Sequence, residues 1–363
     1  MADASPGRLI GVFVVIVALA VVGGVVLGAA GDSGQPDGAE VSGQSPAQFQ
    51  PDAVNEEYDP ETGNIEVDAG EQDKRILVDT RHGNQFSQTD LEPVVEAAFE
   101  SGHTIEFGAS ASSDGRSRRG SGASYGETLS NYDGVLIVQP TGEFSQSERN
   151  ALQNYTDAGG RVAVLAEPTQ IQAALGLFGV PSPVSFGATN LSRNYGLQVG
   201  AEGLYNMNED RNDNNFKSIY ASPSADGTLT EGVETISFDQ GGYVVVNEDH
   251  EDAGRIETLY TAAEGTRTLD TRRTGEYPVV ARNDNMVLVA DSSFIEQSEV
   301  YDVDNEVFVG NLVEFLVSGD LDRSFPSDGG RNSGPTPPAP PEPPGEQEPT
   351  PTPPAEPTPT PSG

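Results

Sequence analysis

The chain has 363 residues, of which 57 are acidic and 19 are basic, so its formal net charge at pH 7 is −38. It contains no cysteine, which excludes disulfides, thiolate metal sites, lipid attachment at a cysteine and a cysteine nucleophile. The acidic excess leaves no basic face that could neutralise phosphates, so a nucleic-acid partner is also excluded.

The scarcity of lysine is a second feature of the composition, because only Lys74 and Lys217 occur. A carboxylate-rich surface with few lysines suits a protein that must stay hydrated in concentrated salt, where screening also weakens the repulsion between like charges. We therefore predict a halophilic source. An ordinary acidic secreted protein is the alternative.

Residues 1–31 are predicted to form an N-terminal transmembrane anchor. Leu9–Ala30 is an uncharged run of 22 residues, which spans roughly 33 Å as a helix and so can cross a bilayer core. Arg8 before it and acidic residues after it predict a single-pass cell-membrane protein with most of the chain outside. The alternative is a signal peptide cleaved near Leu27–Ala30, which would give a secreted protein. Residues 32–72 then form a flexible acidic linker.

The folded part is predicted to extend over residues 73–320 and to begin with a strand, a helix and a strand. Arg75–Thr80 and His103–Phe107 have the apolar pattern of strands. Between them, Thr89 and Glu92 have capping-box spacing for a helix that ends at Gly102. The apolar stripe of this helix comprises Leu91, Val94, Val95, Ala98 and Phe99.

A glycine- and serine-rich loop, residues 109–126, carries Arg116, Arg118 and Arg119. This is the one dense basic cluster in the sequence, and an anion site is one interpretation. We favour a solvated loop, because no strand end or helix N-terminus is fixed beside it.

Tyr132–Thr169 is predicted to form a βαβ unit at the centre of the fold. Its strands are the apolar runs Val135–Val138 and Val162–Ala166, and its helix begins at a capping box formed by Ser145 and Glu148. Two strands joined by such a crossover are parallel, so the loops that follow them lie at one edge of the sheet. These loops supply the candidate ligand-binding residues Gln139, Thr141, Glu167 and Thr169.

The pattern changes after the βαβ unit. Ile171–Phe178 is predicted to be a short helix, and residues 185–274 a β-rich insert or a swapped sheet edge. A hairpin of Tyr277–Arg282 and Met286–Asp291 and a helix over Asn305–Val317 close the domain. The expected strands within residues 185–274 are Thr235–Phe238, Tyr243–Val246 and Glu257–Thr261. Residues 321–363 form a disordered Pro/Thr-rich tail without a core.

The order of these segments resembles a known superfamily. The series Ile76–Asn84, Tyr132–Pro140, Gly159–Glu167, Val287–Phe294 and Asp304–Leu316 is similar to the class I glutamine amidotransferase-like superfamily. The closest resemblance is to a membrane-anchored branch of the haloarchaeal type, domain of unknown function 4350. The resemblance implies a flavodoxin-like three-layer α/β sandwich, a transmembrane anchor and a protein partner in a membrane complex. It implies no established activity.

The departure from catalytic amidotransferases is as informative as the resemblance. In those enzymes a cysteine follows a strand and is activated by a histidine that a carboxylate orients. Here the equivalent turn is Ala166–Pro168, which carries Glu167 in place of a nucleophile, and the late strand ends in Asp291–Ser293. Amidotransferase chemistry is therefore excluded by composition.

The remaining candidate site residues lie at predicted strand ends. Arg81, His82 and Asn84 follow the first strand, and Asp291 and Ser292 follow the last. His82 is a candidate general base with Glu167 and Asp291 as carboxylate partners. We favour a structural role, in which His82 and Asn84 tie down the loop while Gly83 permits a tight bend.

Other kinds of site are weaker interpretations. Ser292 and Ser293 do not stand in a Gly-x-Ser-x-Gly turn, which argues against a serine hydrolase. The oxygen-rich stretches Asn208–Asn215 and Asp302–Glu306 lack the spacing of a calcium loop, so we expect no metal and no cofactor. Glycosylation acceptor patterns occur at Asn154 and Asn190.

Two function classes remain open. The first is a non-catalytic, membrane-anchored binding or assembly module, favoured because the fold is retained without the catalytic residues. The second is a hydrolase that uses His82, Glu167 and Asp291 as acid and base, which requires these three side chains to converge.

Overall fold

The computed structural model describes residues 62–68, 70, 73–108, 124–172, 182–184, 186 and 188–327. The predicted anchor Leu9–Ala30 lies outside the described residues, as do most of the linker, of the arginine-bearing loop and of the tail. Among the described residues, no helix has the length and apolar character needed to cross a membrane.

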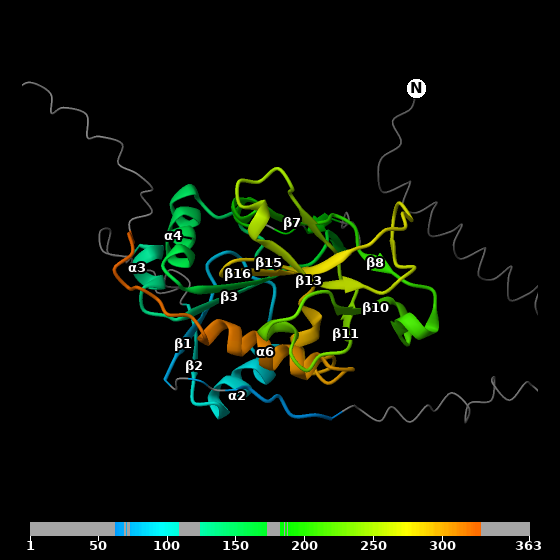
Figure 1. The fold of residues 1–363 in the computed structure, drawn as a ribbon, viewed down its shortest axis with the longest axis horizontal. Coiled ribbons are helices and arrows are strands. Elements are labelled where there is room, and N and C mark those ends of the chain that lie inside the picture. The colour runs from blue at the N-terminus through cyan, green and yellow to red at the C-terminus, as the bar shows by residue number, and fades with distance from the viewer. Residues whose placement is uncertain are drawn as a thin grey trace, which may run out of the picture. The chain divides into compact units, whose positions relative to one another are not determined.

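A large mixed sheet forms the centre of this α/β protein (Figure 1). Neighbouring strands in one half are parallel, and those in the other half are antiparallel. The parallel half consists of β2 (Thr104–Phe107), β1 (Arg75–Val78), β3 (Gly134–Val138), β4 (Arg161–Leu165) and β16 (Met286–Val289). The antiparallel half continues with β15 (Pro278–Asn283), β13 (Ile256–Ala262), β10 (Asn215–Pro223) and β11 (Ile236–Asp239), and β9 (Asn212–Asp213) pairs with β10.

The parallel strands follow the 2-1-3-4-5 order of flavodoxin-like doubly wound sheets, with β16 as the fifth strand. In such sheets the strand order reverses between the first and third strands, and ligands bind at the carboxyl ends there. In this chain that switch point lies between β1 and β3.

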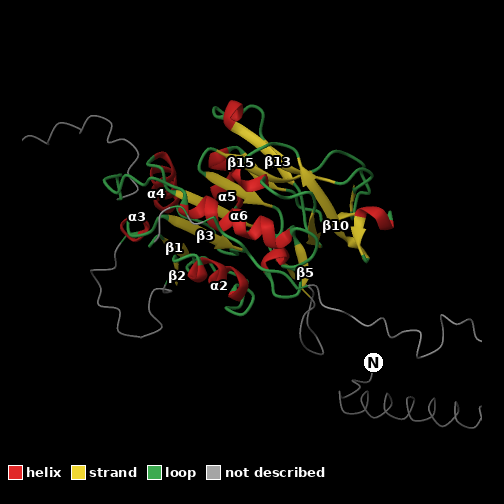
Figure 2. Cartoon of the chain, turned by 60° about the horizontal axis from the view of Figure 1, so that its bottom comes forward, coloured by secondary structure: helices red, strands yellow, loops and turns green. Residues whose placement is uncertain are grey.

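Helices cover both faces of the sheet, so the fold has three layers (Figures 1 and 2). On β1, Ile76 and Val78 pack into one core with helices α2 and α6, whereas Leu77 packs into the other core with α3 and α4. This burial on both sides explains why the parallel strands are almost wholly apolar. The helices are α2 (Glu92–Glu100), α3 (Tyr125–Leu129), α4 (Gln146–Asp157), α5 (Thr189–Ser192) and α6 (Asn305–Val317).

The central βαβ prediction is confirmed. Strands β3 and β4 pair in parallel, and α4 begins after Ser145, whose hydroxyl accepts from the Glu148 amide while the Glu148 carboxylate accepts from the Ser145 amide. Gly159 ends the helix with φ of +98°, a conformation that glycine adopts without strain.

The first helix differs from its prediction. It begins at Glu92 after Leu91, and no Thr89–Glu92 capping box forms. Pro93 lies in its first turn, where its fixed φ favours the helix and its missing N–H is not needed. Phe99, assigned to the apolar stripe, is 77% exposed.

The stretch after β4 also differs from its prediction. Gln170–Gln172 is strand β5, paired with β6 (Ser182–Val184), so the predicted helix is wrong at Ile171 and Gln172. The rest of that predicted helix lies outside the described residues. The hydrogen bonds of a two-stranded ladder replace those of a helix here.

Strands predominate among the described residues of 185–274. Three of them, β10, β11 and β13, extend the central sheet. The short strands form two separate two-stranded sheets. These are β7 (Leu197–Val199) with β12 (Val244–Val246), and β8 (Leu204–Tyr205) with β14 (Arg267–Thr268).

The start of α6 is bonded to β11 and to the two residues that precede this strand. Asp304 lies at the N-cap position, but its side chain makes no cap bond; its Oδ2 instead accepts from the amides of Glu234 (2.8 Å) and Thr235 (2.9 Å). Asn305 is fully buried and exchanges two hydrogen bonds with the backbone of Ser237 on β11, 3.0 and 3.1 Å long. The side chains of Asp304 and Asn305 therefore hold the start of α6 against β11 and the two residues before it.

Asn305→Ala is expected to lower the free energy of unfolding by about 2 to 3 kcal/mol, because it leaves the buried amide and carbonyl of Ser237 without these partners. The matched control is Asn311→Ala on the same helix, which removes one exposed bond to the Glu231 carbonyl and should cost about 0.5 to 1 kcal/mol. Denaturant unfolding at constant salt measures both. Equal losses of unfolding free energy in the two variants would show that the buried bonds of Asn305 to Ser237 add no more stability than an exposed bond.

Candidate functional site

Polar residues directly follow four neighbouring strands at the carboxyl edge of the parallel sheet. Asp79 follows β1, Gln139 follows β3, Glu167 follows β4 by one residue, and Asp291 follows β16 by one residue. The strand order β1-β3-β4-β16 therefore places these side chains in a row along one edge. This edge is the candidate site.

The loops after β1 and β3 are tied together at the switch point. The His82 carbonyl accepts from the amides of Thr141 (3.0 Å) and Gly142 (2.6 Å), and the Asn84 amide group donates to the Val138 carbonyl (2.9 Å). Gly83 has φ of +64°, and its carbonyl accepts from the Thr141 hydroxyl at 2.8 Å. The structure therefore has the tight, hydrogen-bonded turn that the sequence predicts for residues 82–84.

The His82 ring lies in a closed environment and is 5% exposed. Its Nδ1 is 2.7 Å from Asp79 Oδ2, its Nε2 is 3.6 Å from Glu148 Oε1, and it stacks on Phe144 with ring centroids 3.6 Å apart. Tyr125 meets the ring edge-on and donates its hydroxyl to Asp79 Oδ1 at 3.4 Å. The imidazole is held between two carboxylates and two aromatic rings.

The electrostatics of this cluster follow from its burial. Burial, together with the charge of Asp79, raises the pKa of Tyr125 well above its usual range. Burial opposes ionisation of Glu148, but its hydrogen bonds from Ser145 and its proximity to His82 outweigh that cost, so the pKa of Glu148 is lowered. Both effects keep Tyr125 neutral and Glu148 charged beside His82 at neutral pH.

Glu167, Gln139 and Ser292 form a second cluster at the ends of β3, β4 and β16. Glu167 Oε1 accepts from the Ser292 amide (2.9 Å), the Ser292 hydroxyl (2.8 Å) and the Gln139 side-chain amide (3.4 Å). The Gln139 amide also donates to the Ser292 hydroxyl at 2.5 Å. Gln139 has φ of +39°, a strained conformation for this residue type that the surrounding bonds maintain.

Asp291 is fully buried next to this cluster. Its carboxylate accepts from the amide (2.9 Å) and the hydroxyl (2.7 Å) of Ser293. Burial and then the charge of Glu167 raise the pKa of Asp291 well above its usual range. The covering loop contains Gly241 and Gly242, where added Cβ atoms would lie 3.4 Å from Asp291 Cβ and from Pro168 Cδ respectively. The glycines allow this close approach.

The structure brings some predicted site residues together and keeps others apart. Glu167 and Asp291 are neighbours, and Ser292 and Gln139 join them. His82 follows β1, and β3 lies between β1 and β4, so two inter-strand spacings, roughly 10 Å, separate its strand from that of Glu167. Asp79 and Glu148 are the carboxylates that contact His82.

The other candidates are more exposed. Arg81 lies over the Tyr125 ring at 5.4 Å and donates to the Thr128 hydroxyl at 3.1 Å. Thr141 and Thr169 have exposed side chains at the edge. The sequence did not predict that Glu148, Tyr125 and Phe144 contact the His82 ring, because each lies far from His82 along the chain. The only signal recognised among them was the capping box of Ser145 and Glu148.

Among the residues that the structure describes, no group of three or more histidine, aspartate or glutamate side chains is arranged to hold a metal ion. In the oxygen-rich stretch 208–215, Asn208 and Asn212 instead bond to nearby backbone groups.

Asp291→Asn is expected to stabilise the protein increasingly as pH rises. Below about pH 3.9, the usual aspartate value, the carboxyl is protonated in both the folded and unfolded states. As pH rises towards the raised folded pKa, only the unfolded state ionises, so Asp291 costs about 1.4 kcal/mol of stability per unit of pKa elevation.

The measurement is the difference in free energy of unfolding between variant and native protein at pH 4 and pH 7, at constant salt. The exposed control Asp249→Asn should change stability by less than about 0.5 kcal/mol. A difference for Asp291→Asn that does not grow with pH would show that this carboxyl is not held protonated.

Comparisons with known proteins address the fold. No protein-family model matches the chain, and no curated protein matches it. Among solved structures, the mmIFT52 N-terminal domain is similar with a TM-score of 0.49 and 12% identity, covering 68% of this chain and 99% of that chain. A putative ThuA-like protein from Parabacteroides merdae has a TM-score of 0.38 and 12% identity, covering 72% and 100%. Another from Bacteroides uniformis has a TM-score of 0.37 and 12% identity, covering 74% and 98%.

Proposed function

We propose that the chain is a non-catalytic binding or assembly module whose ligand or partner segment contacts the carboxyl edge of the parallel sheet. The supporting observation is that the serine hydroxyls at this edge donate to carboxylates and do not contact the histidine ring. The Ser292 hydroxyl donates to Glu167 and the Ser293 hydroxyl donates to Asp291, while His82 faces Asp79 and Glu148. A hydrolytic nucleophile activated by histidine would need a hydroxyl in contact with the imidazole.

The rigidity of the edge also supports binding. Cross-strand bonds fix the loops after β1 and β3, and Gln139 is held with a strained backbone between Glu167 and Ser292. A surface that is already ordered loses little conformational entropy when it binds, which favours affinity. The exposed groups that a partner would meet there are Arg81, Thr141 and Thr169.

The turnover test uses the purified chain at high salt with a panel of amides, esters and glycosides. We expect no turnover that depends on the site, so the native protein, Glu167→Gln and Asp291→Asn should be indistinguishable from buffer. A true acid or base contributes roughly 10² to 10⁴-fold to rate. Turnover that falls by such a factor in either variant, but not in the control Asp249→Asn, would overturn the proposal.

The alternative function is a hydrolase in which His82 works with Asp79, because Glu167 and Asp291 follow strands that lie farther along the sheet. The observation that favours it is the 2.7 Å contact between His82 Nδ1 and the buried Asp79, since a carboxylate that holds an imidazole in this way orients a general base. The same panel distinguishes the two functions, with His82→Asn as an additional variant.

We also propose that the chain belongs to the membrane-anchored, haloarchaeal-type domain of unknown function 4350 family, with an amidotransferase-like fold. Support comes from the motif order of the sequence and from the 2-1-3-4-5 order of the parallel strands. In this proposal Leu9–Ala30 anchors the chain in the cell membrane, the bulk faces outward, and the edge contacts a protein of a membrane complex.

The anchor is tested by fractionation. The full chain is expected to stay with membranes after an alkaline wash, deletion of residues 2–30 should release it, and protease added to intact cells should remove the folded part. The membrane-bound form should also have the same mobility as the full-length translated product. A product shorter by about thirty residues would instead indicate a cleaved signal peptide.

A further inference from the structure

The central sheet ends with β11 at one side and with β2 at the other (Figure 1). Each of these is a border strand, because it pairs along the path of the sheet with one neighbouring strand only. The outward backbone groups of a border strand can pair with another chain unless something covers them. The two borders of this sheet differ in how they are covered.

Side chains cover the border at β11. Asn305 exchanges two hydrogen bonds with the backbone of Ser237, and the Asp239 amide donates to the Ser293 hydroxyl at 3.2 Å. These side chains belong to α6 and to the turn after β16, and they take the places that a further strand would occupy. The outward groups of Ser237 and the Asp239 amide therefore have partners within the chain.

The border at β2 has a regular parallel ladder on its inner side. The Thr104 amide donates to the Lys74 carbonyl at 2.9 Å, and the Gly108 amide donates to the Val78 carbonyl at 2.8 Å. The register between β1 and β2 runs without a bulge from Thr104 to the end of the strand. Alternate residues of β2 therefore face β1, and the residues between them point their N–H and C=O groups outward.

The outward groups belong to Ile105 and Phe107. In the part of the chain that the structure describes, no backbone or side-chain group bonds to them. The strand, Thr-Ile-Glu-Phe, also lacks the proline, lysine or bulge that commonly protects a border. Two N–H and two C=O groups in a row are therefore available to another strand.

The one charged side chain of β2 is balanced by a cation. Glu106 Oε1 lies 2.7 Å from the Arg75 guanidinium, and Glu106 Oε2 accepts from the Tyr132 hydroxyl at 2.9 Å. The bonds from Arg75 and then from Tyr132 lower the pKa of Glu106. Although the chain has a net charge of −38, β2 therefore brings no unbalanced charge to an interface.

Apolar side chains accompany this open border on the face that α2 covers. Ile105 and Phe107 are partly exposed, and the Phe107 ring lies 6.3 Å from that of Phe86. Phe99, in the last turn of α2, is 77% exposed. Exposed apolar groups beside an unpaired strand indicate a surface for association with another chain.

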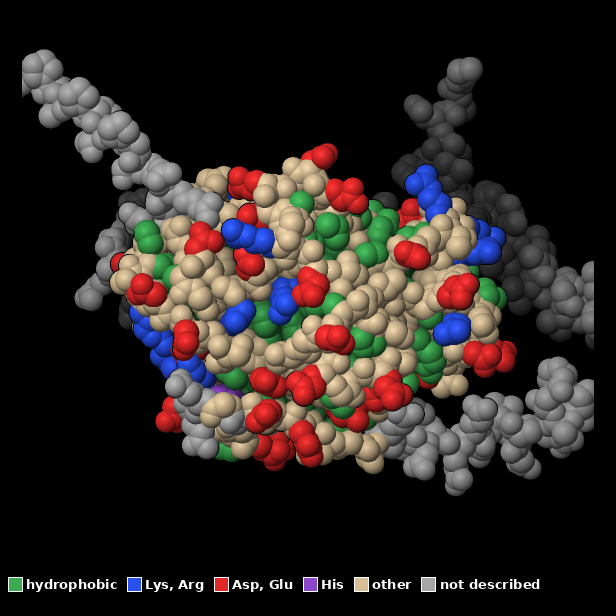
Figure 3. Space-filling model, in the orientation of Figure 1, with side chains coloured by type: hydrophobic (Ala, Val, Ile, Leu, Met, Phe, Trp, Pro, Cys, Tyr) green, Lys and Arg blue, Asp and Glu red, His purple; other side chains and the backbone are tan. Residues whose placement is uncertain are grey.

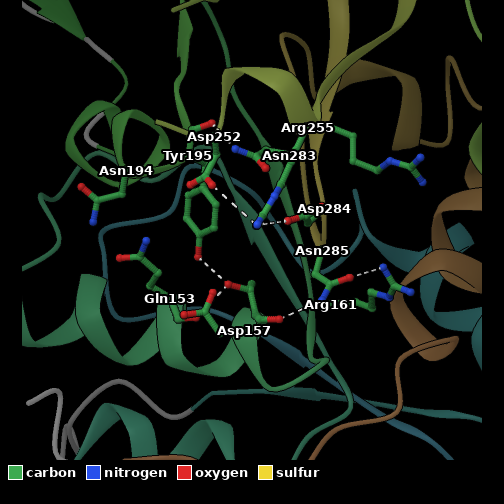
Figure 4. A pocket seen from close by; sticks show the side chains of 12 residues that line it. Gln153, Asp157, Arg161, Asn194, Tyr195, Asp252, Arg255, Asn283, Asp284 and Asn285 are labelled. Atoms are coloured by element: carbon green, nitrogen blue, oxygen red, sulfur yellow. Dashed lines mark hydrogen bonds and ion pairs between the residues drawn. The ribbon is translucent and has the colours of Figure 1, made fainter. Parts of the chain in front are cut away.

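Polar groups elsewhere offer less to a partner, because they bond to one another. In the pocket of about 640 Å³ between α4 and the β15–β16 turn, Arg255 is 2.9 Å from Asp284 (Figure 4). Arg282, which also lines this pocket, is 2.7 Å from Glu257. The outward backbone groups of β2 are therefore the stronger indication of a binding partner.

We propose that β2 pairs with β2 of a second copy of this chain, antiparallel, about a two-fold axis between the two Glu106 residues. Ile105 of each copy then faces Phe107 of the other, and each such pair exchanges two hydrogen bonds. A β-branched residue facing an aromatic one is also a favourable cross-strand pair. The result is a symmetric dimer with one continuous sheet.

Two features favour a second copy over an unrelated strand. Outward residues two positions apart are self-complementary, since a two-fold axis between them pairs all four outward N–H groups with carbonyls. The two Glu106 carboxylates, which face each other across the axis, each carry their own Arg75, so the pairing avoids unbalanced like charges. This association goes beyond the proposed function, because it uses the side of the sheet and not its carboxyl edge.

The test combines light scattering with amide hydrogen exchange of the full chain, at constant high salt, from dilute to concentrated protein. The mass should rise to that of a dimer. The Ile105 and Phe107 amides should then exchange at least about tenfold more slowly, while those of Thr104 and Glu106, already bonded to β1, should change little. A chain that stays monomeric would overturn the proposal, as would a dimer in which the Ile105 and Phe107 amides still exchange rapidly.

Ile105→Pro tests the pairing directly. It removes an outward N–H without removing a bond to β1, and border strands tolerate proline at such positions. The dissociation constant should rise at least about tenfold, because two of the four bonds across the axis are lost. The matched control is Val245→Ser on β12, where the native side chain is 45% exposed, and it should leave association unchanged.

Unchanged dimerisation of folded Ile105→Pro would contradict the proposal, and so would equal weakening by Val245→Ser. Hydrogen exchange of the native chain remains decisive if Ile105→Pro fails to fold.

Discussion

Burial of the parallel strands on both faces is the constraint on which the rest of the structure depends. Because α2 and α6 cover one face and α3 and α4 the other, strands such as β3 and β4 have no solvated side on which to place a polar residue. Polar groups can appear only where these strands begin or end. The two edges of the sheet therefore carry nearly all of the chemistry that the parallel half offers.

The carboxylates at the carboxyl edge are held by neutral donors. Glu167 accepts from Ser292 and Gln139, and Asp291 accepts from Ser293. Hydroxyl and amide donors satisfy lone pairs without cancelling charge, so two neighbouring carboxylates in a buried setting favour retention of a proton by one of them. The two buried carboxylates therefore lower the stability of the fold. Such destabilising groups are common in binding and catalytic sites, where the rest of the fold is stable enough to keep them in place.

Sequence periodicity predicted the parallel framework because the relevant signals are local. The capping box of Ser145 and Glu148 and the glycine stop after α4 act within a few residues, and the parallel pairing of β3 and β4 follows from the crossover. The sequence could not show that Glu148 also faces His82, or that Gly241 and Gly242 close over Asp291, because these contacts join elements far apart in the chain. The predicted capping box of Thr89 and Glu92 was wrong because Pro93, with its fixed φ, determines where α2 begins more strongly than the capping pattern does.

Because acidic groups are spread over the surface, the electrostatic effect of an arginine depends on how deeply it is buried. Figure 3 shows acidic side chains distributed over the visible face, and the whole chain has 19 basic residues to set against 57 acidic ones. Exposed ion pairs contribute little at high ionic strength, whereas partly buried charges are screened much less. An arginine in a half-buried position, such as Arg161, therefore keeps its electrostatic interactions at salt concentrations that screen the exposed charges.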